Sequence, residues 1–339
     1  MAINRLWQAG AELNNTIEFD SIVGSFAASA TQKKTGSYSF AAVDDNRYGI
    51  KSIPATRQIR MGFFLYGGSN NPPSLQPILK FRTSGGTVLA QFETINPGLG
   101  GAYVIDIAGV DKDTEPGMNL ATWQHIGIDL KIDSSAGWMK LYVDGVEKLS
   151  FTGNTGNADI LDFAVGNGAA SGSGVIFYFD DLYVDDTTGE GAAAAPPILR
   201  FYYTTPNADG NYSQWDGSDG NQVNNYLLVD EIPPNSDTDY VETNVVDEFD
   251  SYNMTTITLE AGQQVEAVIP IVFMKRAGST EEIALGTRLS GTDAVGSDQA
   301  PGTSYDTLWE RQTTKPGGGA WGQSDINSFE ALVKSRGSY

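Results

Sequence analysis

Apolar and polar residues alternate through residues 123–147 with the period of two that is typical of a β-strand. The apolar positions of this stretch are Ile126, Ile128, Leu130, Ile132, Met139, Leu141 and Val143. The pair Asp144-Gly145 follows them, and such a pair favours a tight hairpin turn. The pattern therefore predicts antiparallel strands with one buried face and one polar face.

The second half of the chain also has the pattern of strands, with one exception. Apolar runs predict strands at 198–203, 224–229, 256–259 and 265–273. The exception is 324–334, where Ser324 can cap a helix and Ile326, Phe329 and Val333 share one helical face. We therefore predict an all-β chain with a short C-terminal helix.

A change of composition separates the two halves. Residues 188–197 contain Gly, four consecutive Ala and a Pro pair, and they show no strand alternation. This composition is typical of a linker. We therefore predict two β-sandwich (jelly-roll) domains in tandem, at 1–187 and 198–339.

Three motifs of the first half belong together. They are Trp123-Gln-His125, Tyr142-Val-Asp-Gly145 and Tyr178-Phe-Asp-Asp-Leu-Tyr-Val-Asp185. With these motifs, residues 1–189 resemble the laminin-G-like, concanavalin A-like jelly roll. The resemblance implies a sandwich fold and specifies the fold far better than the function.

The second half carries a different set of motifs. They are Ser213-Gln-Trp-Asp216, the run from Tyr226 to Val241, and Trp321-Gly-Gln-Ser-Asp-Ile-Asn-Ser-Phe-Glu330. With them, residues 198–339 resemble a module of structural proteins of tailed bacteriophages. The resemblance implies a non-enzymatic virion component of the tail, neck, baseplate or capsid surface. It would be made in the host cytoplasm, form homo-oligomers and contact other virion structural proteins.

Composition removes several classes of function. The chain has 339 residues, no Cys and one His, which excludes thiol chemistry and a His-cluster metal site. Its formal net charge of −21 repels phosphate backbones, so we expect no nucleic-acid partner. We also expect no signal peptide and no membrane insertion, because no apolar run is long enough.

The negative charge is concentrated in the second half. After residue 189 the chain has 22 of its 42 acidic residues but only 8 of its 21 basic residues. Residues 230–250, the acidic window, contain eight acids and no Lys or Arg. Two interpretations stay open: a solvated face, or a surface that binds cations or a basic partner.

The sequence does not predict an enzyme. Glycosidases of concanavalin A-like fold carry Glu-x-Asp-x-x-Glu on one strand, and two segments here come close to it. Glu18-Phe-Asp-Ser and Glu248-Phe-Asp-Ser both lack the final Glu, so neither offers a proton donor to a leaving group. His125 lies in a strand, where a structural role is the default.

One structural Ca²⁺ site is implied by the resemblance, and no other cofactor is predicted. Sandwiches related to carbohydrate-binding domains pair an early Gly-x-Glu with a late aromatic-x-Asp-Asp. Gly10-Ala-Glu12 and Tyr178-Phe-Asp-Asp181 fit that pattern. Strand alternation sends Asp180 and Asp181 to opposite faces, so one of them would join Glu12. The alternative is that Glu12 caps a turn.

The alternative function is carbohydrate binding and host adhesion. Aromatic candidates for a surface glycan are Tyr48, Tyr66 and Trp138. The loop 67–73 offers no aromatic residue, which favours assembly over sugar binding. For assembly, the candidate interface residues are Phe201, Tyr202 and Tyr203, because aromatic side chains are enriched in interface cores.

Overall fold

The structure is a computed structural model of the whole chain. It describes residues 4–67, 75–95, 99–119, 121–168, 174–191, 195–278 and 281–337. The chain divides into two compact units, residues 1–201 and residues 202–339. The all-β fold class is confirmed, and within the described ranges no helix is long and apolar enough to cross a membrane.

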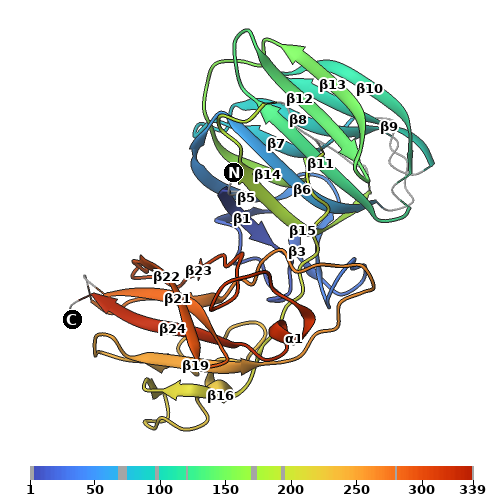
Figure 1. Cartoon of the computed structure of the whole chain (residues 1–339). Helices are drawn as coiled ribbons and strands as arrows, with labels where there is room; N and C mark the ends of the chain where they lie inside the picture. The colour runs from blue at the N-terminus through green and yellow to red at the C-terminus, as the bar shows by residue number, and fades with distance from the viewer. Residues whose placement is uncertain are drawn as a thin grey trace. The chain divides into compact units, whose positions relative to one another are not determined.

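The first unit consists of two large antiparallel sheets (Figure 1). The eight-stranded sheet has the order β13 (Val146–Gly153), β12 (Gly137–Val143), β11 (Gln124–Lys131), β6 (Gln58–Gly67), β15 (Ile176–Asp186), β4 (Ser39–Val43) and β3 (Phe26–Ser29), with β1 (Asn4–Ala9) also on β15. The seven-stranded sheet has the order β10 (Val110–Asn119), β9 (Leu99–Ile107), β8 (Val88–Ile95), β7 (Gln76–Arg82), β14 (Ile160–Asn167), β5 (Arg47–Thr56) and β2 (Ser21–Val23). Their inner faces share one hydrophobic core, as in a jelly-roll sandwich.

The predicted hairpins at 123–147 are present. Ile128 pairs with Leu141 across β11 and β12, and both side chains are fully buried. Asp144 and Gly145 have φ values of 49° and 79°, the left-handed conformation that a two-residue turn of this type requires. The alternating pattern therefore identified both the strands and their buried face.

The second unit is built around one sheet of five strands. The order is β16 (Pro206–Ser213), β19 (Phe249–Met254), β24 (Glu330–Gly337), β21 (Glu281–Leu289) and β22 (Thr292–Gln299). Two strand pairs accompany it: β17 (Asp216–Gly217) with β18 (Val241–Glu242), and β20 (Ile271–Met274) with β23 (Asp306–Trp309). The unit has two small core clusters, one around Trp215 and one around Trp321.

The predicted C-terminal helix is shorter than expected. Helix α1 spans only Gln323–Ile326, and Phe329 to Lys334 lead into and through strand β24. This strand lies between β19 and β21, so both edges of its backbone find hydrogen-bond partners. Pairing on two sides outweighs a local helical pattern, because it satisfies every N–H and C=O of a buried segment.

Other strand predictions of the second half also need correction. Residues 198–203 and 256–259 form no regular strand, and 265–273 contributes only the start of β20. Residues 224–229 contain a 3₁₀ helix, η1 (Asn225–Leu228), in place of a strand. The Asp209 carboxylate accepts the N–H groups of Asn224 and Tyr226, which holds this tight turn.

The described part of the predicted linker packs on the first unit. Gln58 Nε2 donates to the Glu190 carbonyl at 2.9 Å, and the Arg60 guanidinium is 2.8 Å from the Glu190 carboxylate. Tyr183 Oη donates to the carbonyl of Pro197 at 2.5 Å. These bonds fix the segment on strands β6 and β15.

Candidate functional site

The first and last strands of the first unit bring the predicted Ca²⁺ ligands to one place. Strand β1 pairs with β15, with Ala9 opposite Leu182. Glu12 lies three residues after the end of β1, while Asp180 and Asp181 lie within β15. All three side chains are buried. The predicted juxtaposition of an early Glu with a late Asp pair is therefore present.

The two aspartates do not point to opposite faces. A register shift interrupts β15 between Asp180 and Tyr183, and Asp181 has a φ of 51°. As a result Asp180 accepts the backbone N–H of Thr35 at 3.1 Å, and Asp181 accepts the Thr35 hydroxyl. The expected alternation was wrong here because a β-bulge turns the second side chain back toward the first.

All three carboxylates bind the same loop, residues 34–38. The N–H of Ser37 donates to both Glu12 oxygens at 2.9 and 2.8 Å, and the N–H of Tyr38 donates at 3.0 Å. Asp180 also accepts the N–H of Lys34 at 2.7 Å. Glu12 therefore fixes a turn, as the alternative interpretation proposed, while lying beside two further buried acids.

Burial makes it unfavourable for the carboxylates of Glu12, Asp180 and Asp181 to be ionised. Burial raises the pKa values of Glu12, Asp180 and Asp181; the charge of Asp181 raises the pKa of Asp180 further, and the charge of Glu12 raises that of Asp181. Glu18 adds a fourth acid, since burial and the nearby Glu12 charge raise its pKa to about 7. Neither Glu18 oxygen has a geometrically good hydrogen bond within the described residues. A proton or a cation would relieve this concentration of charge.

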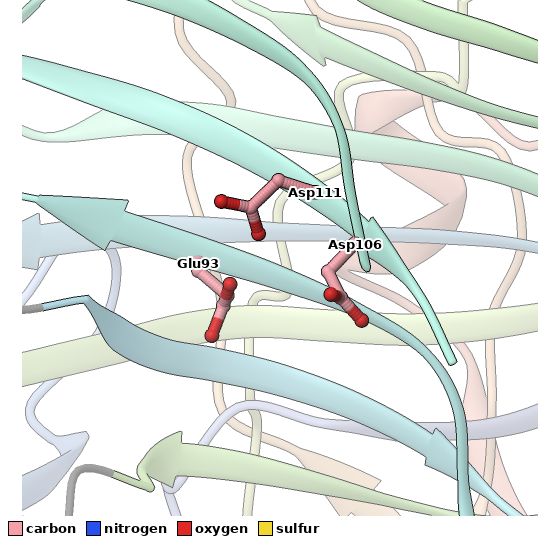
Figure 2. Close-up of side chains that lie close together, drawn as sticks. All are labelled: Glu93, Asp106 and Asp111. Carbon is pink, nitrogen blue, oxygen red and sulfur yellow. The ribbon is translucent and has the colours of Figure 1, made fainter. Parts of the chain in front are cut away.

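A second acid group lies on the seven-stranded sheet (Figure 2). Glu93, Asp106 and Asp111 come from the adjacent strands β8, β9 and β10, and one oxygen of each lies within 4.8 Å of the other two. Among the described residues this is the only group of three acids that meets this distance. Glu12, Asp180 and Asp181 are not as close together.

The sequence analysis missed the second group because cross-strand register brings it together. Asp106 pairs directly with Asp111 across the turn at Ala108 and Gly109. The Ala108-Gly109 turn after the apolar run of β9 was the available signal for that pair. Glu93, by contrast, reaches the group from β8, and no local pattern of the sequence shows the pairing of β8 with β9.

The second group is a set of oxygen ligands under mutual repulsion. Burial, followed by the charges of Asp106 and Asp111, raises the pKa of Glu93 to about 7. Burial also raises the pKa of Asp106, while the Lys80 ammonium acts in the opposite direction on Glu93. Oxygen ligands of this type suit Ca²⁺ or Mg²⁺, which prefer carboxylates.

Three aromatic rings gather on the outer face of the eight-stranded sheet. The Tyr66 ring centroid lies 5.7 Å from that of Trp123 and 5.9 Å from that of Tyr178. Tyr66 is on the opposite side of β6 from Phe63 and Leu65, which belong to the core. Tyr66 and Trp123 are half-buried, so part of each ring faces solvent. We call these three residues the aromatic cluster.

The other two glycan candidates lie apart from the aromatic cluster. Trp138 is only 8% exposed, and the Lys131 ammonium covers its ring at 5.0 Å from the centroid. Tyr48 is a half-buried residue of β5, and its backbone packs tightly against Gly166. Most of the loop 67–73 lies outside the described residues.

The interface candidates are all half-buried and do not form a strand. The N–H of Phe201 donates to Asp181 Oδ1 at 2.9 Å, at the end of the first unit. In the second unit, Tyr202 Oη donates to Gln263 Oε1 at 2.8 Å. These residues therefore have structural contacts of their own, while the part of each ring that remains accessible can still contact a partner.

Three of the residues considered for catalysis, His125, Glu248 and Asp250, have structural partners. His125 packs edge-on against Phe64, and burial lowers the pKa of its imidazole to about 4. Its backbone N–H, rather than its ring, donates to Asp144 at 2.9 Å. Glu248 accepts the Thr243 hydroxyl at 2.5 Å, and Asp250 accepts the Tyr252 hydroxyl at 2.5 Å.

Comparison with known proteins adds little beyond the fold. No family model and no curated protein matches the chain. The binding domain of Paraclostridial Mosquitocidal Protein 1 matches 54% of this chain and 49% of its own, with 10% identity and a TM-score of 0.40. Domain 4 of AbnA, a GH43 extracellular arabinanase from Geobacillus stearothermophilus solved with arabinotriose, matches 57% of this chain and 94% of its own, with 13% identity and a TM-score of 0.37.

A third similar structure is the Caenorhabditis elegans galectin LEC-6. It matches 42% of this chain and 94% of its own, with 11% identity and a TM-score of 0.29. The chain spans about half the length of the mosquitocidal binding domain. Likeness at these values carries no argument about function.

Proposed function

We propose that the chain is a non-enzymatic binding protein whose first unit recognises carbohydrate. The observation that carries this proposal is the aromatic cluster of Tyr66, Trp123 and Tyr178. Sugar rings have apolar faces that pack on aromatic side chains, and their hydroxyls require hydrogen-bonding groups nearby. Tyr66 and Trp123 offer partly exposed rings on an outer sheet face, where a ligand can reach them, and the buried ring of Tyr178 supports Tyr66 from the side.

Polar groups border the aromatic cluster. The Thr31 side chain lies within hydrogen-bonding reach of the Tyr178 hydroxyl. Phe64 lies two residues before Tyr66 on the same face of β6, and the Lys34 ammonium lies 5.0 Å from its ring centroid. Rings and polar groups side by side form the mixed surface that a glycan requires.

Binding to a panel of immobilised polysaccharides tests this proposal. We expect Tyr66→Ala and Trp123→Ala to weaken binding by about tenfold or more, since each removes a stacking surface. Tyr48→Ala is the matched control, because Tyr48 is half-buried but outside the cluster. Thermal melting shows whether each variant is folded. Equal binding by the wild type and both cluster variants would contradict the proposed site.

A role in virion assembly is the second candidate. We propose it for the second unit, where the resemblance to tailed-phage structural proteins lies and where five of the nine exposed large apolar side chains of the described residues occur, all between residues 214 and 248. Such side chains on a folded surface mark contacts with other proteins. Electron cryomicroscopy of purified particles tests this role, and absence of the chain from particles would reject it.

A further inference from the structure

A long connecting segment, which we call the excursion, extends from one end of the five-stranded sheet in the second unit. It spans residues 214–248 and connects β16 to β19. Its two ends meet, since the N–H of Gln214 donates to the Phe249 carbonyl at 3.1 Å. The pairing of β17 with β18 closes it again further out. Trp215 and Val241 anchor it in the core of the unit.

Exposed apolar side chains concentrate on this excursion. Of the nine large apolar residues that are exposed among the described residues, five belong to it: Val223, Leu227, Ile232, Val245 and Val246. Val223 is 64% exposed and Leu227 is 52% exposed, so water reaches most of both side chains. We take these five side chains as the apolar part of a candidate contact surface.

The backbone around these residues is fixed. The N–H of Val223 donates to Asn221 Oδ1 at 2.7 Å, and the N–H of Leu227 donates to the Asn224 carbonyl at 3.0 Å. Farther along, Ser335 Oγ donates to the Val245 carbonyl at 2.7 Å. The side chains are therefore held in solvent by an ordered backbone, which lowers the entropy cost of binding.

The excursion is also strongly acidic. Asp237 pairs with Lys275 at 2.6 Å, and Asp247 pairs with Lys334 at 2.8 Å. Asp230, Glu231 and Glu242 form no ion pair with any basic residue that the structure describes. The surface thus combines exposed apolar side chains with unneutralised negative charge.

We propose that residues 214–248 bind a basic protein surface that also presents apolar side chains. This inference rests on the proposed assembly role and names the kind of partner. Charge complementarity selects the partner, because a second copy of a chain with a net charge of −21 would be repelled. The apolar side chains then supply the contact that charge alone does not give.

A fluorescent amphipathic Leu/Lys peptide serves as the probe, and poly-lysine of equal charge serves as the purely electrostatic comparison. We expect Val223→Ser with Leu227→Ser to weaken peptide binding by the full-length chain about tenfold, with no change for poly-lysine. The matched control is Val110→Ser with Val146→Ser, since both valines are exposed in the first unit. Glu231→Gln with Glu242→Gln should weaken both probes and reduce their salt dependence.

Equal weakening by the two apolar double variants would overturn the proposal, as would equal binding of both probes to every variant. Detection of the chain in purified particles tests the assembly role separately from the docking surface at residues 214–248. A chain that is present in particles but fails the peptide test keeps its assembly role and loses this docking surface.

Discussion

Single residues of the first unit show how closely the loop 34–38 depends on one carboxylate. Gly36 has a φ of 58°, and a Cβ added there would lie 2.3 Å from the carboxyl carbon of Glu12. Both the left-handed backbone and the close approach require glycine. The same loop donates to Asp180 and Asp181, so a shift at Gly36 disturbs the whole acid group.

We predict that Gly36→Ala lowers the free energy of unfolding of the first unit by about 1–3 kcal/mol, because it combines backbone strain with steric overlap. Urea unfolding measures this loss. Gly86→Ala is the control, since Gly86 has a φ of 76° but nothing within 4 Å of an added Cβ. A loss at Gly36 no larger than at Gly86 would show that contact with Glu12 is unimportant.

At the scale of elements, local patterns were sufficient for some strands and misleading for others. The hairpin of β12 and β13 was predictable because alternation and the Asp144-Gly145 turn both lie within one short stretch. Strand β24 was not predictable. Ile326, Phe329 and Val333 have helical spacing, and the partner strands β19 and β21 are remote from β24 in sequence. The group of Glu93, Asp106 and Asp111 was missed for a similar reason.

The hairpin face makes a prediction at this scale. Leu141 of β12 is fully buried in the sandwich core. Truncation of Leu141 to Ala leaves a cavity and should lower the free energy of unfolding by about 2–5 kcal/mol. Val146→Ala is the exposed comparison, because Val146 begins β13 and is 58% exposed. If thermal or urea unfolding showed the same small loss for both, the assignment of the buried face would be wrong.

At the scale of the whole molecule, buried acids set how the first unit responds to pH. Burial raises the pKa of Glu18 and of Glu93 to about 7, from 4.5 for an exposed Glu. The folded state therefore binds more protons than the unfolded state between these values. Stability contributed by the protonated acids is present below about pH 4.5 and is lost as pH rises toward 7.

We predict that the melting temperature of the first unit, measured in the intact chain with a chelator present, falls between pH 5 and pH 8. Ca²⁺ should reverse part of the fall at pH 8, because a cation bound only by the folded state replaces the lost protons. Two variants show which of the two acid groups binds the Ca²⁺. Asp106→Asn should reduce the Ca²⁺ response if the cation binds beside Glu93, whereas Asp181→Asn should reduce it if the cation binds beside Glu12. A melting temperature that rises from pH 5 to pH 8 would contradict the raised pKa values. A fall that Ca²⁺ leaves unchanged would instead mean that protons alone balance these carboxylates, with no cation at either group.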